Sequence, residues 1–275
     1  MKKMIFPIIT EFDLKLPYYI IGVGCYYNQE HINRPNGYPY YQWIQCRSGS
    51  GKLILNDHTY TISENQGMLL FPDASHEYYA ISDSWEVDWI IFQGLFIDNF
   101  FKYTAEINKS GVYYLSQQQL VASKIVKAYE IELSDSPTKS IEISRLTYDI
   151  LMDILTFSSI KNDSSIASQY NRLKPLFDFI DQNYSKSLCL AELAQVVGIT
   201  PQHLCNSFKK ITTHTITMYI NMIRIKKSKE LILQDKNMQI KEIARLVGFQ
   251  DISYFSSIFK KLEKMSPMDF RKLHV

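Results

Sequence analysis

The first 110 residues carry the pattern of a β-domain. Short segments rich in β-branched and aromatic residues, such as 18–28 and 85–94, follow one another at intervals of about ten residues. Gly, Asn, Asp and Ser separate them, and many segments alternate apolar and polar side chains with the period of two that is typical of half-buried strands. These features together predict an antiparallel β-sandwich or barrel over residues 1–110.

The hydrophobic pattern then changes to the helical period. Apolar residues recur at helical spacing over 116–133 and again over 141–157, with Pro137 between the two segments. A polar, Ser-rich stretch follows, which we interpret as a linker. After the linker the pattern is helical, with short breaks, to the end of the chain. We therefore expect a β-domain at 1–110, a helical pair at 111–160, a linker at 161–171 and an all-helical domain at 172–275.

The all-helical part contains an internal repeat. The segment 190–210 (LAELAQVVGITPQHLCNSFKK) aligns with 240–261 (IKEIARLVGFQDISYFSSIFKK), with one residue inserted in the second copy. Each copy has the pattern of a short amphipathic helix, a turn and a second helix. The matching residues are Glu192 and Glu242, Ala194 and Ala244, Val197 and Val247, Gly198 and Gly248, and Phe208 and Phe259.

Each copy has the form of a helix-turn-helix. Gly198 and Gly248 can adopt the left-handed conformation that ends a helix. The second helix of the first copy begins at Thr200-Pro201, a capping residue followed by a proline at the first helical position, and that of the second copy begins at Asp251. A helical bundle with repeated hairpins is the plain alternative, but two copies in register favour DNA binding.

The segment between the two copies predicts one helix. Residues 216–233 have no helix-breaking residue, and a helix of this length spans about 27 Å. Successive turns of the major groove are about 34 Å apart. A rigid helix of this length could hold two recognition helices in adjacent major-groove turns.

The charge distribution agrees with DNA binding by the helical part. Residues 172–275 carry 17 Lys and Arg against 9 Asp and Glu, whereas the first 171 residues carry 13 against 19. Lys and Arg neutralise phosphates, so the basic part is the candidate for binding double-stranded DNA. Ordinary variation of surface charge is the alternative.

Composition excludes several other classes of protein. The chain is 46% hydrophobic, which excludes a disordered chain. It has neither a long apolar run nor a secretory signal, so we expect no membrane partner and a cytoplasmic location. The four cysteines are scattered without a CxxC pair, and we expect reduced thiols rather than disulfides or a zinc site.

The second copy of the repeat, continued to Lys272, resembles the C-terminal signature of the AraC/XylS family of bacterial transcription regulators. A glycine is usual in that family after each FKK segment, where this chain has Thr213 and Lys264, so those turns must form without glycine. The resemblance implies a DNA-binding activator that contacts RNA polymerase and forms a homodimer through the helical pair. The residues that carry it are Ile243, Ala244, Gly248, Phe249, Tyr254, Phe255, Phe259, Lys260, Ser266, Pro267 and Arg271, with Tyr219 and Arg224 continuing the first copy.

Eight side chains are the candidates for DNA contact. Gln and Asn can form two hydrogen bonds with adenine, and His or Lys can donate to guanine. The short Ser side chains of the second copy suit single hydrogen bonds or phosphate contacts, so we expect the first copy to supply more of the sequence specificity. A solvated helix end is the alternative for the lysines. The candidates are Gln202, His203, Asn206 and Lys209 in the first copy and Ser253, Ser256, Ser257 and Lys260 in the second.

The segment 34–94 resembles the sugar-sensing, cupin-like half of the same family, and most of all its arabinose-responsive member. The resemblance rests on RPNGYPYYQWIQCRSGSGKLILND, GMLLFPDASHEYYA and WEVDWIIFQG. It implies a small-molecule effector, a carbohydrate, held by Arg34, His76, Tyr78 and Trp89. Arg can donate to sugar oxygens and an aromatic face can stack on the ring. A structural hydrogen bond for His76, and a place in the core for the aromatic residues, are the alternatives.

A metalloenzyme is the main catalytic alternative for a cupin-like fold. Its metal site commonly needs an HxH pair, a Glu and a later His. The chain has no HxH pair, and His31 and His58 lie in different turns from His76. It also has no GxSxG nucleophile motif and no Gly-rich phosphate loop. We therefore expect no enzymatic activity, no metal and no cofactor.

The predicted fold class is α+β with two domains, an N-terminal cupin-like β-sandwich or barrel with a helical pair and a C-terminal all-α double helix-turn-helix. Two functions remain open. One is a ligand-responsive, sequence-specific activator of bacterial sugar-metabolism genes. The other is a DNA-binding regulator whose N-domain only dimerises or binds a protein partner, without a small ligand. The apolar segment before Tyr18 is predicted to fold over the ligand site, with an ordinary first strand as the alternative.

Overall fold

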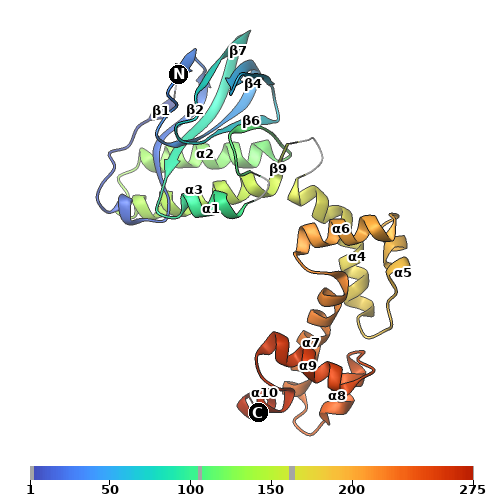
Figure 1. Cartoon of the computed structure of the whole chain (residues 1–275). Coiled ribbons are helices and arrows are strands. Elements are labelled where there is room, and N and C mark those ends of the chain that lie inside the picture. The colour runs from blue at the N-terminus through green and yellow to red at the C-terminus, as the bar shows by residue number, and fades with distance from the viewer. Residues whose placement is uncertain (1–2, 105–106, 161–164, 275) are drawn as a thin grey trace. The chain divides into compact units, whose positions relative to one another are not determined.

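The computed structural model describes residues 3–104, 107–160 and 165–274. Contacts divide the chain into two compact units, Met1–Ser168 and Gln169–Val275. The first unit combines a sheet with helices, and the second contains helices alone among its described residues (Figure 1). The predicted fold class is confirmed.

The described part of the N-terminal unit is built on one sheet of nine antiparallel strands. The main path through the sheet runs β1-β2-β7-β4-β6-β8-β9, while β3 pairs with β7 and β5 with β4. The strands are β1 (Lys3–Ile5), β2 (Tyr19–Asn28), β3 (Ile32–Arg34), β4 (Tyr41–Leu55), β5 (His58–Ile62), β6 (Gln66–Leu70), β7 (His76–Gln93), β8 (Gly111–Leu115) and β9 (Ser158–Ser159).

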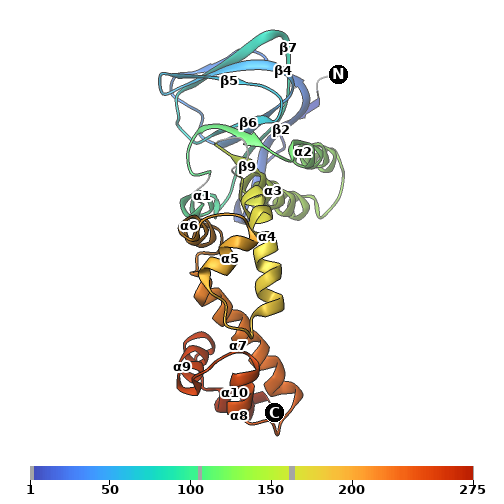
Figure 2. The ribbon, with the colours of Figure 1, turned by 90° about the vertical axis from the view of Figure 1, so that its right-hand side faces the viewer.

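The two longest strands, β4 and β7, form the spine of this sheet. They pair from Tyr41 opposite Phe92 to Leu55 opposite His76, with register shifts between Cys46 and Ser48 and between Gly49 and Gly51. Each strand changes its second partner near these shifts, because β4 pairs with β6 before them and β5 after them. Bulges bend strands and increase their twist, so the sheet curls around one of its faces (Figure 2).

The curled sheet has two apolar faces. Its inner face holds a core that includes Ile44, Leu53, Met68 and Val87. Its outer face packs on three helices, α1 (Ile97–Tyr103), α2 (Gln118–Glu132) and α3 (Lys139–Phe157), which lie together below the sheet in Figure 1. The helices α2 and α3 correspond to the predicted helical pair. The short helix α1 and strands β8 and β9 were not predicted.

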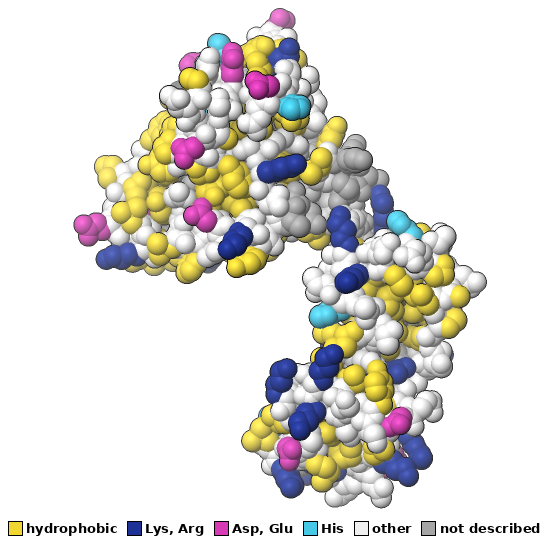
Figure 3. Space-filling model, viewed as in Figure 1, with side chains coloured by type: hydrophobic (Ala, Val, Ile, Leu, Met, Phe, Trp, Pro, Cys, Tyr) yellow, Lys and Arg dark blue, Asp and Glu magenta, His cyan; other side chains and the backbone are white. Residues whose placement is uncertain are grey.

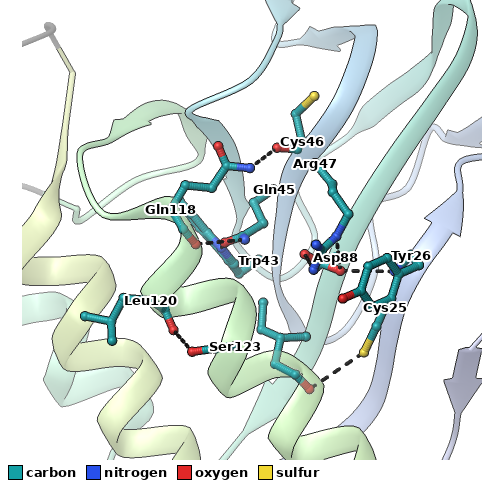
Figure 4. A network of polar contacts seen from close by, with 11 residues as sticks. Cys25, Tyr26, Trp43, Gln45, Cys46, Arg47, Asp88, Gln118, Leu120 and Ser123 are labelled. Atoms are coloured by element: carbon teal, nitrogen blue, oxygen red, sulfur yellow. Dashed lines mark hydrogen bonds and ion pairs between the residues drawn. The ribbon is translucent and has the colours of Figure 1, made fainter.

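Polar contacts fasten α2 to the sheet (Figure 4). The side-chain amide of Gln118 donates to the carbonyl of Cys46. Gln45 donates to the carbonyl of Gln118 at 3.4 Å and accepts from the indole of Trp43 at 3.1 Å. These groups are buried, so each bond avoids the cost of an unsatisfied polar atom. The start of α2 is thereby held against β4.

The described part of the C-terminal unit is a string of seven helices. The first of them corrects the predicted linker at 161–171, because residues 166–171 are helical and residues 161–164 lie outside the described part. The helix begins before Arg172, at Ile166, and within it Tyr170 stacks on Phe177 with ring centroids 5.1 Å apart. The helices are α4 (Ile166–Asn183), α5 (Leu190–Val196), α6 (Pro201–Thr212), α7 (Ile216–Gln234), α8 (Ile240–Leu246), α9 (Ile252–Glu263) and α10 (Pro267–His274).

The second helix of each repeat starts and stops by recognisable local chemistry. The side chain of Thr200 accepts from the amide of His203, and that of Asp251 accepts from the amide of Tyr254. At the other end, Thr213 and Lys264 adopt left-handed φ values of 61° and 64°. The turns that usually contain glycine thus form with side chains present, at a steric cost.

We expect Thr213→Gly to stabilise the C-terminal unit. Glycine removes the clash between Cβ and the backbone at a left-handed φ, and the expected gain is about 0.5–1 kcal/mol. Lys210→Gly, within α6, is the matched control and should lose about 1 kcal/mol. Urea unfolding of the full chain, followed by circular dichroism, measures both. Destabilisation by Thr213→Gly would contradict the strain argument.

Candidate functional site

A cavity of about 230 Å³ opens on the inner side of the sheet in the N-terminal unit. Its walls come from the first half of the sheet and from β7, and they combine aromatic, aliphatic and amide side chains. Its volume lies below the range of about 300–1,000 Å³ that drug-sized ligands occupy, so it suits a small molecule. The lining residues are Met4, Phe6, Tyr27, Gln29, Ile32, Arg34, Gln42, Ile44, Tyr78, Trp89 and Ile91.

Trp89 forms one wall because β2 carries glycines opposite it. A Cβ at Gly24 would lie 2.3 Å from the indole of Trp89, so only glycine lets the ring lie flat on the strand. Phe6 packs against the same ring, with centroids 5.7 Å apart, and Tyr27 meets it edge-on at 6.1 Å. The indole is therefore fixed between β2 and two further aromatic residues.

Arg34 is the charged side chain of the lining. Its Nη1 donates to Oε1 of Gln42 at 2.8 Å, and its guanidinium carbon lies 4.1 Å from the ring centroid of Tyr38. Arg34 forms no ion pair with any described residue. Its remaining donors are therefore available to oxygen acceptors in the cavity.

His76 lies behind this wall rather than in it. It is the cross-strand neighbour of Arg34 and stacks on Tyr78 with ring centroids 5.8 Å apart. Nδ1 lies 2.6 Å from the carbonyl of Ala74, and because a carbonyl only accepts, Nδ1 carries the hydrogen. Nε2 is then a buried acceptor with no hydrogen-bond partner in the described part of the chain. Burial lowers the pKa of His76 and raises the pKa of Tyr78 to about 12, so both side chains are neutral near pH 7.

Arg34, Tyr78 and Trp89, which the sequence predicts as ligand contacts, all line the cavity. Two buried glutamines of the lining were missed, Gln42 in β4 and Gln29 just after β2, because a buried amide has no sequence signature of its own.

The N-terminal segment was predicted to fold over the ligand site, with an ordinary first strand as the alternative, and it has features of both. Residues 3–5 form strand β1, which pairs with β2, and Met4 and Phe6 line the cavity. Phe6 remains 57% exposed and thus stands at the mouth of the cavity.

The C-terminal unit presents the second helices of both repeats, α6 and α9. In α6 the candidate side chains Gln202, His203, Asn206 and Lys209 are all exposed. None of them donates or accepts a side-chain hydrogen bond with a described residue. Lys and Arg side chains predominate over Asp and Glu on the face of this unit shown in Figure 3. Such a surface suits a polyanion.

The corresponding face of α9 is less uniform. Ser253, Ser257 and Lys260 are exposed, whereas Ser256 is half-buried. Phe255 and Phe259 anchor α9 in the second helical core, as Leu204 and Phe208 anchor α6 in the first.

Comparison with known proteins supports the predicted character of both the N-terminal and the C-terminal unit. Residues 18–128 match the model of an AraC-like ligand binding domain, and residues 193–273 match the model of a helix-turn-helix domain. The chain belongs to the AraC/XylS family of transcription regulators. The resemblance inferred from the sequence is confirmed, and the cavity lies within the matched ligand-binding domain.

Relatives of this AraC/XylS regulator are found in several bacteria. The Msm operon regulatory protein of Streptococcus mutans is 27% identical over 232 residues, covering 82% of this chain and 81% of that protein. The HTH-type transcriptional activator RhaR of Mannheimia succiniciproducens is 23% identical over 82% of each chain. Among solved structures, ToxT from Vibrio cholerae covers the whole chain at 16% identity with a TM-score of 0.35. The two matched domains, the Msm operon regulatory protein and RhaR indicate a family of transcription regulators rather than of enzymes.

Two further features of the regulator concern metals and membranes. Within residues 3–104, 107–160 and 165–274, no three His, Cys, Asp or Glu side chains gather as a metal site would require. No described helix is both long enough and apolar enough to cross a lipid bilayer.

The four cysteines are free thiols, Cys25 and Cys46 buried and the other two exposed.

We expect the N-terminal domain to lose stability in mild acid because of His76. Its folded-state pKa lies below the ordinary value of 6.5, so the unfolded chain binds the proton more readily. Stability should therefore be constant above about pH 6.5 and fall as the pH decreases below it. His76→Asn keeps a donor for Ala74 but cannot titrate, so its melting temperature should fall less between about pH 7 and pH 5. Equal slopes for the two proteins would contradict this role.

Proposed function

We propose that this regulator activates bacterial sugar-metabolism genes in response to a carbohydrate effector. Its ligand is a small sugar bound in the cavity of the N-terminal domain, and its output is the binding of a homodimer to paired DNA sites beside RNA polymerase. The combination of Arg34 donors with the face of Trp89 in one small cavity carries the proposal.

The chemistry of the cavity suits a polyhydroxylated ring. Trp89 and Tyr78 offer aromatic faces to C–H surfaces, while Arg34, Gln29 and Gln42 offer donors and acceptors for hydroxyl groups. The unpartnered Nε2 of His76 is a further acceptor close behind Tyr78. A purely apolar ligand would leave these polar groups without partners, which costs free energy.

The helical pair supports the proposed homodimer. One apolar face of α3 packs in the core beneath the sheet and is not available to a partner, with Leu146, Ile150, Leu151, Ile154 and Leu155 as its members. Other apolar side chains of the pair remain exposed and form the candidate interface. These are Leu120, Leu133, Ile141 and Tyr148.

The positions of the polar side chains along α6 and α9 support the proposed roles, with base contact by α6 and phosphate contact by lysines of both helices. Gln202, His203 and Asn206 lie in the first half of α6, the part of a recognition helix that contacts base edges. Lys209 and Lys260 lie near the helix ends, where a cation suits phosphate contact.

A thermal-shift screen with neutral mono- and disaccharides tests the ligand. A sugar at 100 times its dissociation constant should add about 2.7 kcal/mol of stability to the protein. Arg34→Met should abolish the shift. It also removes the donor to the buried Gln42, so its melting temperature without sugar should be lower, and the shift is measured against that sugar-free value. Arg145→Met, on α3, is the control and should keep the shift. If no sugar raises the melting temperature of the wild type, the result favours the alternative, an N-domain that only dimerises or binds a protein.

Two substitutions test the DNA face. Asn206→Ala should cost about 1–3 kcal/mol at one base position and relax the preference there. Lys260→Ala should weaken binding to all sequences and reduce the slope of affinity against salt. Selection from random DNA followed by salt titration separates the two effects. Unchanged affinity and base preference in Asn206→Ala would show that α6 reads DNA through another face.

A further inference from the structure

The C-terminal unit contains two helix-turn-helix units, the first formed by α4, α5 and α6 and the second by α8, α9 and α10. These two contact each other in addition to being joined by α7. Tyr184, which follows α4 in the first unit, packs against the core of the second unit. Gly248, in the turn of the second unit, has φ +95°, and a Cβ there would lie 2.5 Å from the carbonyl oxygen of Ser185. Backbone therefore meets backbone at this point, and the two units have a defined contact.

Arg224 closes the same contact from the middle of α7. Its Nε donates to the carbonyl of Tyr184 at 2.7 Å, and its Nη2 donates to the carbonyl of Lys186 at 2.9 Å. Both carbonyls belong to the connection between α4 and α5, in the first unit. The guanidinium also lies 5.5 Å from the ring centroid of Phe249, in the second unit. One side chain thus bridges three segments of the C-terminal unit.

A second bond ties α7 directly to α9. The side-chain amide of Asn221 donates to the hydroxyl of Tyr254 at 3.0 Å, and Asn221 is buried. Tyr254 lies in the first turn of α9, the part of that helix nearest the candidate DNA contacts. The orientation of α9 is therefore coupled to α7 one turn away from Arg224.

We propose that Arg224 is a positioning residue that fixes the separation of the two DNA-reading helices. It contacts no base in this scheme. It holds the α4–α5 connection and the turn at Gly248 as one rigid piece, so that α6 and α9 reach successive major-groove turns at a single spacing. The inference rests on the proposed two-site reading of DNA by α6 and α9.

The geometry favours this role over general stabilisation. A cation with two carbonyl acceptors and an aromatic face has directional contacts in two units, whereas an ordinary surface arginine has none. Breaking them leaves α7 and both cores in place, since Arg224 belongs to neither core. The expected consequence is freedom of one unit relative to the other. When the geometry of two linked DNA-binding units is no longer fixed, the effective concentration of the second unit at its site falls, and so does the affinity of the pair.

Binding to DNA of altered spacing tests the proposal with the full chain. The probe is a duplex selected by the wild type from random-sequence DNA, together with versions carrying two base pairs inserted or deleted midway between the two major-groove sites that α6 and α9 of one protomer contact. The wild type should bind the altered duplexes at least about tenfold more weakly. Arg224→Ala should bind the parent duplex about tenfold more weakly but discriminate between spacings less than about threefold.

Two further variants keep the test decisive. Tyr254→Phe removes only the hydroxyl that accepts from Asn221 and should flatten the spacing profile in part, even if Arg224→Ala folds poorly. Arg245→Ala removes an exposed cation of α8 without an internal contact, and should lower affinity at every spacing while leaving the profile unchanged. A wild-type profile with no dependence on spacing would overturn the two-site reading itself. A spacing-dependent wild type with the same profile in Arg224→Ala and Tyr254→Phe would overturn only the positioning role.

Discussion

The pairing of β4 with β7 is the constraint on which the N-terminal domain depends. It runs from Tyr41 opposite Phe92 to Leu55 opposite His76 and fixes which side chains face each side of the sheet. Trp89 faces the cavity, and Asp88, one residue earlier, faces the helices. A slip of one residue would exchange these faces and place a carboxylate in the ligand site and an indole against α2.

Asp88 shows how firmly the register is held. It is fully buried. Its Oδ2 lies 2.7 Å from Nη2 of Arg47 in an ion pair, and its Oδ1 accepts from the backbone amide of Tyr26 at 3.1 Å (Figure 4). Tyr26 has a left-handed φ of 51° at the bulge where β2 shifts register against β7. The guanidinium of Arg47 also lies 3.8 Å from the ring centroid of Tyr26. Removing Arg47 would leave the charge of Asp88 buried and unpaired, at a cost of about 3–5 kcal/mol.

The sequence allowed most of the architecture to be predicted, because the features involved are local. Period-two alternation marked the strands, and the caps at Thr200 and Asp251 marked the second helices of the repeat. The features that were missed depend on distant partners. Helix α1 is short, and it forms where Ile97 and Phe101 pack against the sheet. Gln29 and Gln42 enter the cavity only because strands far apart in sequence pair. The linker was predicted from its Ser-rich composition. Residues 166–171 are helical instead, and the packing of Tyr170 on Phe177 within that helix is not visible in composition.

The contact between Tyr184 and the second helical core bears on how such domains can be exchanged. The repeat in the sequence looks like two interchangeable copies, and α7 looks like the natural place to divide them. A division there would strip the second core of the aromatic ring it borrows from the end of α4, and would leave the backbone at Gly248 without its neighbour. A fusion that keeps both copies together from Gln169 onward preserves those contacts. The two copies of the repeat therefore share contacts that an exchanged domain has to carry together.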